Sequence, residues 1–357
     1  MSSRENTQVV ADASAMDEEL HVLREGVESV LSALAAGQSV QAGAASVRIP
    51  AEPDVMYDPV RYVLASGGKR LRPVLLLLAA RIFGGDEDDA LPAALAVEIF
   101  HNFTLVHDDI MDSANERRGR SSVHVKWDES TAILCGDYLM GLSYALLAQA
   151  KPRAGAPCWN PTTAIGRFQD MLALLCEGQA LDEVFERRTD VSVQEYLSMI
   201  DRKTGALLQA SLEIGGMLGG ADETHLKYLR TVGRHAGRAF QIRDDLLDLT
   251  AEDIRWGKVK GGDLIEGKRT YILLRAIEQT RGEDRRWFER IVREAGLPAD
   301  QVDEARERMQ RAGVIDEAQA AVRRHTGEAL RATRRLPDVS SSETLRGLLQ
   351  RMQERMH

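Results

Sequence analysis

Aromatic residues are scarce in this sequence, since Phe, Trp and Tyr make up only 5% of its 357 residues. Runs of β-branched residues, which favour strands, are also scarce, and this lack argues against a sheet-based fold. Ala, Leu, Arg and Glu are abundant instead, as is typical of packed helices. The sequence therefore predicts an all-α fold. Because the composition does not change sharply near the centre, it also predicts one large domain over residues 51–357.

Cysteine is rare, with Cys135, Cys158 and Cys176 the three examples. Their odd number and irregular spacing exclude a disulfide framework and a cysteine metal site, and favour reduced thiols in the cytoplasm. The longest apolar segment, near residues 74–83, is too short to span a bilayer and is interrupted by Arg81. The N-terminus lacks the apolar segment of a signal peptide and is acidic, unlike a transit peptide. We therefore expect a soluble cytoplasmic protein.

The net charge of -9 and the pI near 5.5 argue against a nucleic-acid partner. Residues 1–14 are polar and unpatterned, which predicts a disordered start. Residues 15–36 show the apolar periodicity of one amphipathic helix, and the Gly, Ala and Ser residues of 37–50 predict a linker. These segments together form an expected N-terminal extension, residues 1–50.

Two acidic motifs stand in otherwise apolar helical sequence, Asp-Asp-Ile-Met-Asp at 108–112 and Asp-Asp-Leu-Leu-Asp at 244–248. On a helix Asp108 lies almost above Asp112, and Asp244 above Asp248, about 6 Å apart along the axis. Carboxylates stacked in this way destabilise a helix unless a cation neutralises them. All-oxygen ligands favour Mg²⁺, which completes its shell with water and substrate phosphate. The two motifs therefore predict a magnesium site for a substrate that carries a diphosphate.

A solvated acidic face and a di-iron site also place carboxylates on helices, but each accounts for less of the sequence. A solvated face explains one acidic cluster, but it does not explain why apolar pairs interrupt both. A di-iron site in a helical bundle needs two Glu-x-x-His pairs, and the sequence offers one, Glu98 with His101. The magnesium site is therefore favoured.

A diphosphate also needs cations, and the sequence has four basic clusters. They comprise Lys69, Arg70 and Arg72; Arg117 and Arg118; Lys203; and Lys258, Lys260, Lys268 and Arg269. Arginine offers a planar fork that matches phosphate oxygens, and lysine offers a mobile point charge. These clusters are therefore candidate diphosphate ligands.

With these acidic and basic motifs, the sequence resembles the trans-isoprenyl diphosphate synthases, the polyprenyl synthetase family. The matching segments, in family order, are Gly-Gly-Lys-Arg-Leu-Arg-Pro at 67–73, Phe-Thr-Leu-Val-His before the first acidic motif at 103–107, Arg-Arg-Gly at 117–119, Gly-Asp at 136–137, Gly-Gln at 178–179, Lys-Thr-Gly at 203–205, Phe-Gln-Ile-Arg before the second acidic motif at 240–243, Gly-Gly-Asp-Leu at 261–264 and Gly-Lys at 267–268. They extend over about residues 51–275, and several independent motifs coincide.

The resemblance implies a bundle of long antiparallel helices around a deep apolar pocket, usually in a homodimer. It implies that this chain condenses isopentenyl diphosphate head-to-tail with allylic diphosphates. Three magnesium ions would bind with the diphosphate on Asp108, Asp112 and Asp244, supported by Asp109, Asp245 and Asp248. The implied ligands of the allylic phosphates are Arg117, Lys203, Gln241, Lys258 and Lys268, with Thr204 near the reacting carbon. The implied ligands of isopentenyl diphosphate are Gly68, Lys69, Arg72, His101 and Arg118.

The same resemblance bears on product length. Thr104 is small and lies one turn below Asp108, whereas the aromatic Phe103 lies further around the helix. This combination is similar to archaeal-type geranylgeranyl diphosphate synthases and predicts a twenty-carbon product. A farnesyl diphosphate synthase, or a silent subunit of a heteromeric synthase, remains the alternative. A terpene cyclase is disfavoured, because its second motif usually carries Asn, Ser or Thr, and Glu.

Overall fold

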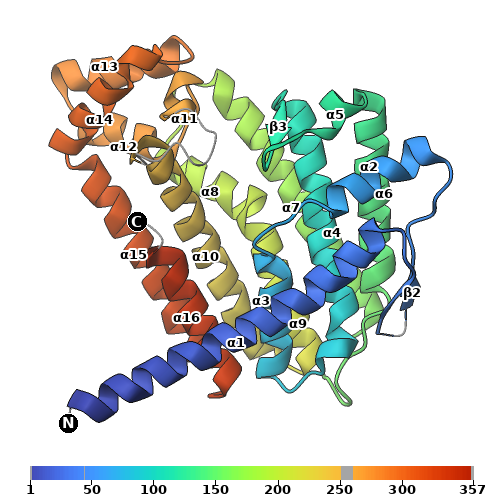
Figure 1. The fold of residues 1–357 in the computed structure, drawn as a ribbon. Helices are drawn as coiled ribbons and strands as arrows, with labels where there is room; N and C mark the ends of the chain where they lie inside the picture. Colours follow the sequence, from blue (N-terminus) through green and yellow to red (C-terminus); the bar gives the residue numbers. More distant parts are fainter. Residues whose placement is uncertain (1, 44, 251–259, 355–357) are drawn as a thin grey trace. The chain divides into compact units, whose positions relative to one another are not determined.

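The computed structural model describes residues 2–43, 45–250 and 260–354, and these residues are predominantly helical (Figure 1). The helices are α1 (Ser2–Ala35), α2 (Asp54–Leu64), α3 (Leu71–Ile82), α4 (Glu87–Met111), α5 (Val123–Lys126), α6 (Glu129–Leu147), α7 (Pro161–Arg187), α8 (Val193–Lys203), α9 (Gly205–Gly219), α10 (Glu223–Thr250), α11 (Gly262–Ile265), α12 (Tyr271–Gln279), α13 (Gly282–Arg293), α14 (Val302–Arg311), α15 (Val314–Thr333) and α16 (Ser340–Glu354), with a 3-10 turn η2 (Ala299–Gln301). The strands are β1 (Val40–Ala42), β2 (Ala45–Val47), β3 (Glu116–Arg117) and β4 (Arg120–Ser121), and they form two antiparallel hairpins. The predicted all-α fold is confirmed.

The chain forms two compact units. Unit 1 comprises Met1–Phe168, Ala210–Arg230 and Arg334–Gly347, and unit 2 comprises Gln169–Gln209, Thr231–Thr333 and Leu348–His357. Helices α7, α9, α10 and α16 contribute residues to both units. The predicted boundary at residue 50 coincides with neither unit, and the single domain over residues 51–357 stays a prediction.

The core of unit 1 is built around α3 and α4. Seven consecutive residues of α3, from Val74 to Ala80, are at most 4% exposed. Helix α4 packs against α3 and, more extensively, against α6. Gly215 of α9 packs directly against the Leu76 carbonyl of α3, where a side chain would overlap the backbone. The acidic motif at the end of α4 is therefore carried by the most completely packed helices of this unit.

Helix α1 also belongs to unit 1. Its residues Leu23, Val27, Leu31 and Leu34 form one fully buried stripe, as the sequence predicts. The helix begins at Ser2, however, where the sequence predicts disorder. Propagating a helix is far easier than nucleating one, so polar residues can extend a helix whose later turns are packed. The linker at 37–50 also differs from the prediction, because it contains the β1–β2 hairpin with Val40 opposite Val47.

The core of unit 2 lies among α8, α10, α12, α13 and α15. Ile242 and Leu249 of α10, Leu273 of α12 and Phe288 of α13 are fully buried in it. Helix α10 alternates these apolar residues with the polar residues of the second acidic motif. The packing of α10 leaves Asp244 and Asp248 of the motif half-buried, whereas Asp245 is buried.

A pair of histidines lies within unit 2, between α10 and α15. The Nδ1 atoms of His235 and His325 are 2.9 Å apart, so one ring donates and the other accepts. Burial lowers the pKa of His325 to about 4, helped by the nearby His235, Arg238 and Arg324 and opposed by Glu328. The pKa of His235 is lowered by burial and by Arg234 and Arg238, and is opposed by Glu328 and Asp201. Both rings are therefore neutral at pH 7.

We expect the free energy of unfolding to fall as the pH is lowered from about 6.5 to about 4, because the unfolded chain then binds protons that the folded pair excludes. The loss through His325 is up to about 3 kcal/mol at pH 4. Urea unfolding measured between pH 7 and pH 4 tests this. His325→Gln should flatten the pH dependence, whereas His21→Gln, at an exposed position of α1, should leave it unchanged; an equal slope in His325→Gln contradicts the assignment.

Candidate active site

Both acidic motifs lie at the C-terminal ends of their helices. Helix α4 ends at Met111 with Asp112 as its cap, and α10 ends at Thr250. The C-terminal end of a helix carries a partial negative charge, and carboxylates there are unfavourable. Neither helix has a basic residue in its last turn to compensate. Each motif therefore favours a bound cation.

The donors that these motifs offer are carboxylate oxygens, which suit Mg²⁺. Asp108 and Asp244 are half-buried, and Asp112 is exposed, so all three are in contact with solvent. Among the described residues, no three His, Cys, Asp or Glu side chains converge closely enough to hold a metal by themselves. Mg²⁺ typically takes only one or two carboxylates at a site and keeps oxygens from water and phosphate. The residues present therefore fit magnesium held jointly with a diphosphate.

Asp109 differs from its neighbours because it is buried, with 4% exposure. Its Oδ1 accepts a hydrogen bond of 2.6 Å from Nε of Arg117, and Nη2 of Arg117 lies at the same distance. Burial raises the pKa of Asp109, and Arg117 opposes the shift. The second aspartate of the motif therefore fixes Arg117 beside the end of α4.

Arg117 and Arg118 lie in the β3–β4 hairpin. Arg118 and Gly119 form its two-residue turn, both with left-handed φ angles, of 55° and 72°. Such a turn matches the twist of a hairpin and favours glycine at its second position. The hairpin is anchored to α2, because Tyr62 donates a hydrogen bond of 2.8 Å to the Ser121 carbonyl and the Arg120 guanidinium lies 3.8 Å from the Tyr62 ring centre. Arg117 and Arg118, two predicted phosphate ligands, thus lie in a hairpin that is bonded to α2.

Four arginines of the basic clusters act electrostatically on His101 of α4. The pKa of His101 is lowered well below its usual value by burial, and further by Arg72, Arg118, Arg117 and Arg70. His101 is therefore neutral and offers one N–H donor. The concentration of positive charge around it suits a diphosphate.

The loop before α3 joins this cluster. A side chain on Gly68 would lie 3.0 Å from the Arg118 guanidinium, so glycine allows the close approach. Lys69 is exposed beside it. Of the predicted isopentenyl diphosphate ligands, the structure therefore brings Gly68, Arg72, His101 and Arg118 together within unit 1, with Lys69 next to them in the chain.

Asp245 is the buried member of the second motif. It accepts hydrogen bonds from the Tyr196 hydroxyl at 2.6 Å, the Tyr271 amide at 2.8 Å and the Gln241 amide at 3.1 Å. Burial raises its pKa to about 7, although all three hydrogen bonds oppose the shift. Asp245 therefore anchors Gln241 and α12 in unit 2.

Three predicted phosphate-site residues of unit 2, Lys203, Thr204 and Gln241, lie near Asp245 in the fold. The Thr204 hydroxyl donates to Oε1 of Gln241 at 3.2 Å, and Nζ of Lys203 lies 2.6 Å from Asp182. Gly178 of α7 contacts the backbone of Lys203 so closely that a side chain there would overlap it. The structure thus brings Lys203, Thr204 and Gln241 together at the junction of α8 and α9.

The segment after α10 is described only in part. Lys258 lies outside the described residues. Asp248 accepts a hydrogen bond of 3.1 Å from the Asp263 amide, and Lys268 lies 2.8 Å from Glu266. Asp244 lies 3.7 Å from the Arg243 guanidinium.

Two arginines of the basic clusters are wrongly predicted as phosphate ligands. Arg70 is buried and bonded to Glu28 and Glu98. Arg269 is 8% exposed and donates to the backbone carbonyls of Arg188, Gly267 and Val292. Both guanidiniums bind partners that are mostly distant in sequence, and a basic run does not reveal such partners.

The two predicted chain-length residues are both largely buried. The Phe103 ring packs edge-on against Phe100 and His107, with ring centres 5.1 and 4.9 Å apart. The Thr104 hydroxyl donates to the His101 carbonyl at 2.8 Å. Their role in product length stays a prediction.

Sequence reasoning missed three residues that hold members of the motifs and basic clusters: Glu98 in unit 1, and Asp182 and Tyr196 in unit 2. Glu98 entered only through the di-iron alternative, yet its carboxylate lies 2.7 Å from Arg70. The helical periodicity of α4 places Glu98 one turn before His101, and this spacing could have indicated that Glu98 lies close to the basic residues around His101. Asp182 and Tyr196 meet their partners through tertiary contacts and left no sequence signal.

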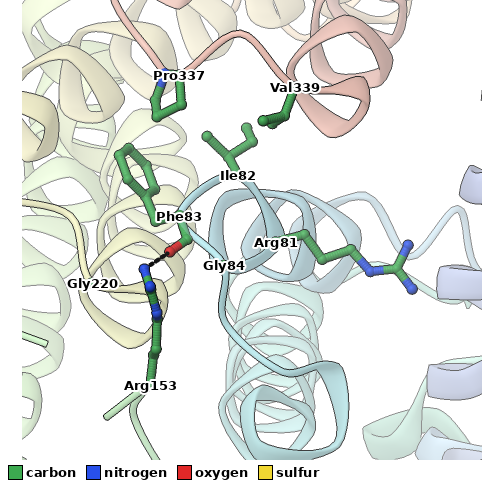
Figure 2. A pocket seen from close by; sticks show the side chains of 8 residues that line it. All are labelled: Arg81, Ile82, Phe83, Gly84, Arg153, Gly220, Pro337 and Val339. Carbon is green, nitrogen blue, oxygen red and sulfur yellow. Dashed lines mark hydrogen bonds between the residues drawn. The ribbon is translucent and has the colours of Figure 1, made fainter. Parts of the chain in front are cut away.

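A separate hollow of about 440 Å³ lies at the C-terminal end of α3 in unit 1 (Figure 2). It is lined by Arg81, Ile82, Phe83, Gly84, Arg153, Gly220, Pro337 and Val339. Arg153 donates to the Phe83 carbonyl at 3.0 Å, as the dashed line in Figure 2 shows. None of the predicted site residues lines it.

The polyprenyl synthetase family model matches residues 53–309. The geranylgeranyl diphosphate synthase of Methanosarcina mazei is 44% identical over 231 residues, which cover 64% of this chain and 69% of that protein. The geranylfarnesyl diphosphate synthase of Natronomonas pharaonis is 41% identical over 269 residues, 71% of this chain and 78% of that protein. The crystal structure of geranylgeranyl pyrophosphate synthetase from Pyrococcus horikoshii superposes with a TM-score of 0.82 at 33% identity, covering 95% of this chain and 99% of that one. The chain therefore belongs to the polyprenyl synthetase family, the trans-prenyltransferases that its motifs predict.

Proposed function

We propose that this chain condenses isopentenyl diphosphate with allylic diphosphates head-to-tail and releases geranylgeranyl diphosphate. The observation that carries this proposal is the pair of acidic motifs near helix ends that have no basic residue in the last turn, together with the arginines that lower the pKa of His101. Relatives that carry the name geranylgeranyl diphosphate synthase support the class of product.

The reaction breaks the allylic C–O bond, and the bonding electrons leave with diphosphate. The double bond of isopentenyl diphosphate then attacks the allylic cation, and a proton lost to the departing diphosphate restores a double bond. Asp108, Asp112 and Asp244 would hold magnesium, three ions in all, which neutralises the leaving diphosphate. Arg117, Lys203, Gln241, Lys258 and Lys268 would bind the same phosphates, and Thr204 would face the reacting carbon.

Isopentenyl diphosphate would bind on a second set of cations, which lies within unit 1. Arg72 and Arg118 provide charge, Gly68 allows close approach, and Lys69 is exposed to reach the ligand. His101 would donate one hydrogen bond as a neutral ring. Fixed cations of this kind orient the double bond and stabilise the charge that develops during transfer.

Diphosphate release tests this function and separates its alternatives. The purified protein is incubated with Mg²⁺ and geranyl diphosphate, with and without isopentenyl diphosphate. The proposal predicts release that requires both substrates. Release from geranyl diphosphate alone would indicate a cyclase, and no release in either incubation would indicate a silent subunit.

The homodimer belongs to the same proposal, and α6 offers a surface for it. Ile133 and Leu134 are 47% and 55% exposed on this helix. Among the described residues, α6 is the one helix long and apolar enough to cross a membrane, and 39% of it is buried. We expect a second copy of the chain, instead of a membrane, to cover this apolar face.

We expect Leu134→Asp to convert the dimer to a monomer, because a charge buried in an apolar interface without a partner is costly. Light scattering coupled to size-exclusion chromatography measures the mass. Val22→Asp is the matched control, since Val22 is 45% exposed on α1. A dimer that survives Leu134→Asp, or a monomeric wild type, contradicts this surface.

A further inference from the structure

Arg70 lies between two proposed isopentenyl diphosphate ligands, Lys69 and Arg72, but faces the interior. Its side chain is fully buried. Nε lies 2.6 Å from Glu28 of α1, Nη1 lies 2.7 Å from Glu98 of α4, and Nη2 donates to the Ser66 carbonyl at 3.0 Å. All three guanidinium nitrogens are therefore occupied by protein groups.

The backbone at Arg70 is held in an unusual conformation. Its φ of 48° and ψ of 35° are left-handed, a conformation that is sterically unfavourable for a non-glycine residue. Such a residue persists where surrounding contacts over-determine it. Here the two carboxylates hold the side chain inward, while Lys69 on one side remains exposed and α3 begins on the other.

Arg70 is also connected to the β3–β4 hairpin. The Ser66 carbonyl accepts from Arg70 and, at 3.3 Å, from Arg118. Arg118 also donates to the Gly67 carbonyl. One peptide segment, 66–68, thus links the buried ion pairs to a guanidinium of the proposed site.

Glu98 acts on a further member of the site. Burial lowers the pKa of Arg72, and Glu98 opposes the shift most strongly. Nε of Arg72 is buried without a hydrogen-bond partner. Glu98 therefore balances the charge of Arg72 without occupying that nitrogen.

We infer that Glu28 and Glu98 are positioning residues for isopentenyl diphosphate, acting through Arg70 on Lys69, Arg72 and Arg118. Glu28 lies before the residues that the family model matches, so α1 would contribute to the site from outside that region. Helix α1 is bonded to both ends of α3. Its Glu28 contacts Arg70, the N-cap of α3, and its Glu19 lies 3.2 Å from Arg81 in the last turn of α3. This inference rests on the proposed function.

The test is steady-state kinetics of Glu28→Gln with both substrates varied. Glutamine keeps the shape of the side chain but removes its charge, and hydrogen bonds to charged groups contribute more than neutral ones. We expect the KM for isopentenyl diphosphate to rise about tenfold, while kcat and the KM for the allylic substrate change less than about twofold. Arg70→Met should produce the same selective rise, and adding Glu28→Gln to it should have little further effect. Glu25→Gln, exposed and one turn earlier on α1, is the control.

An unchanged KM for isopentenyl diphosphate in Glu28→Gln, or an equal loss for both substrates with a lower Tm, would overturn the inference and leave a structural role. These outcomes require an active wild type. If the wild type binds and elongates nothing, the proposed function itself fails, and the kinetic comparison between variants does not arise. Arg70→Lys provides the remaining check, since it keeps the charge but not the fork and should recover part of the affinity.

Discussion

Asp108→Asn is expected to lower kcat about a thousandfold, and Asp244→Asn to do the same. Each aspartate is a proposed magnesium ligand at a helix end without a basic residue in its last turn. Removing one carboxylate weakens the neutralisation of the leaving diphosphate by several kcal/mol. Rates of isopentenyl incorporation at saturating substrate, measured over a range of Mg²⁺ concentrations, give the effect. The magnesium requirement of each variant should rise as well.

The matched control is Asp88→Asn, because Asp88 is an exposed carboxylate at the other end of α4. It should retain the wild-type rate. Helical circular dichroism of all three variants verifies that they fold. Wild-type turnover in a folded Asp108→Asn or Asp244→Asn protein would refute the metal assignment.

Thr104→Phe is expected to shift the main product from the twenty-carbon to the fifteen-carbon chain. Thr104 is 7% exposed and lies one turn before Asp108, so an aromatic ring there would shorten the proposed pocket. Chain lengths are measured by mass spectrometry after dephosphorylation. Phe103→Ala, by contrast, should allow longer products, because it removes a buried ring that packs on Phe100 and His107.

Thr104→Ser is the appropriate control, since it keeps the hydroxyl that bonds to the His101 carbonyl. Its product should be that of the wild type. If Thr104→Phe still makes the twenty-carbon product at a wild-type rate, residues other than Phe103 and Thr104 determine the length.

The chemistry of the site was largely predictable from the sequence, because it depends on local patterns. The spacing of Asp108 and Asp112 within one helix follows from helical geometry alone. Arg117 and Arg118 follow the first acidic motif closely in the chain, so their closeness to that motif was predictable from the sequence as well. Both motifs indeed lie at helix ends in the structure.

The partners of individual arginines were not predictable in this way. Arg70 and Arg72 are two residues apart and alike in chemistry, yet Arg70 is fully buried on Glu28, 42 residues earlier. The tertiary packing of α1 and α4 around Arg70 determines which guanidinium faces inward. The same applies to Asp245 and its donor Tyr196, 49 residues earlier. Long-range ion pairs and hydrogen bonds therefore distinguish the buried structural residues of each motif from those that remain in contact with solvent.

The most direct test of the proposed function is the product that the wild-type protein makes. Labelled isopentenyl diphosphate and Mg²⁺ are supplied separately with five-, ten- and fifteen-carbon allylic diphosphates, and the dephosphorylated products are identified by mass spectrometry. The proposal predicts geranylgeraniol, formed only with magnesium present. A different chain length would retain the prenyltransferase and contradict the roles of Phe103 and Thr104, whereas no elongation from any primer would contradict the proposed function.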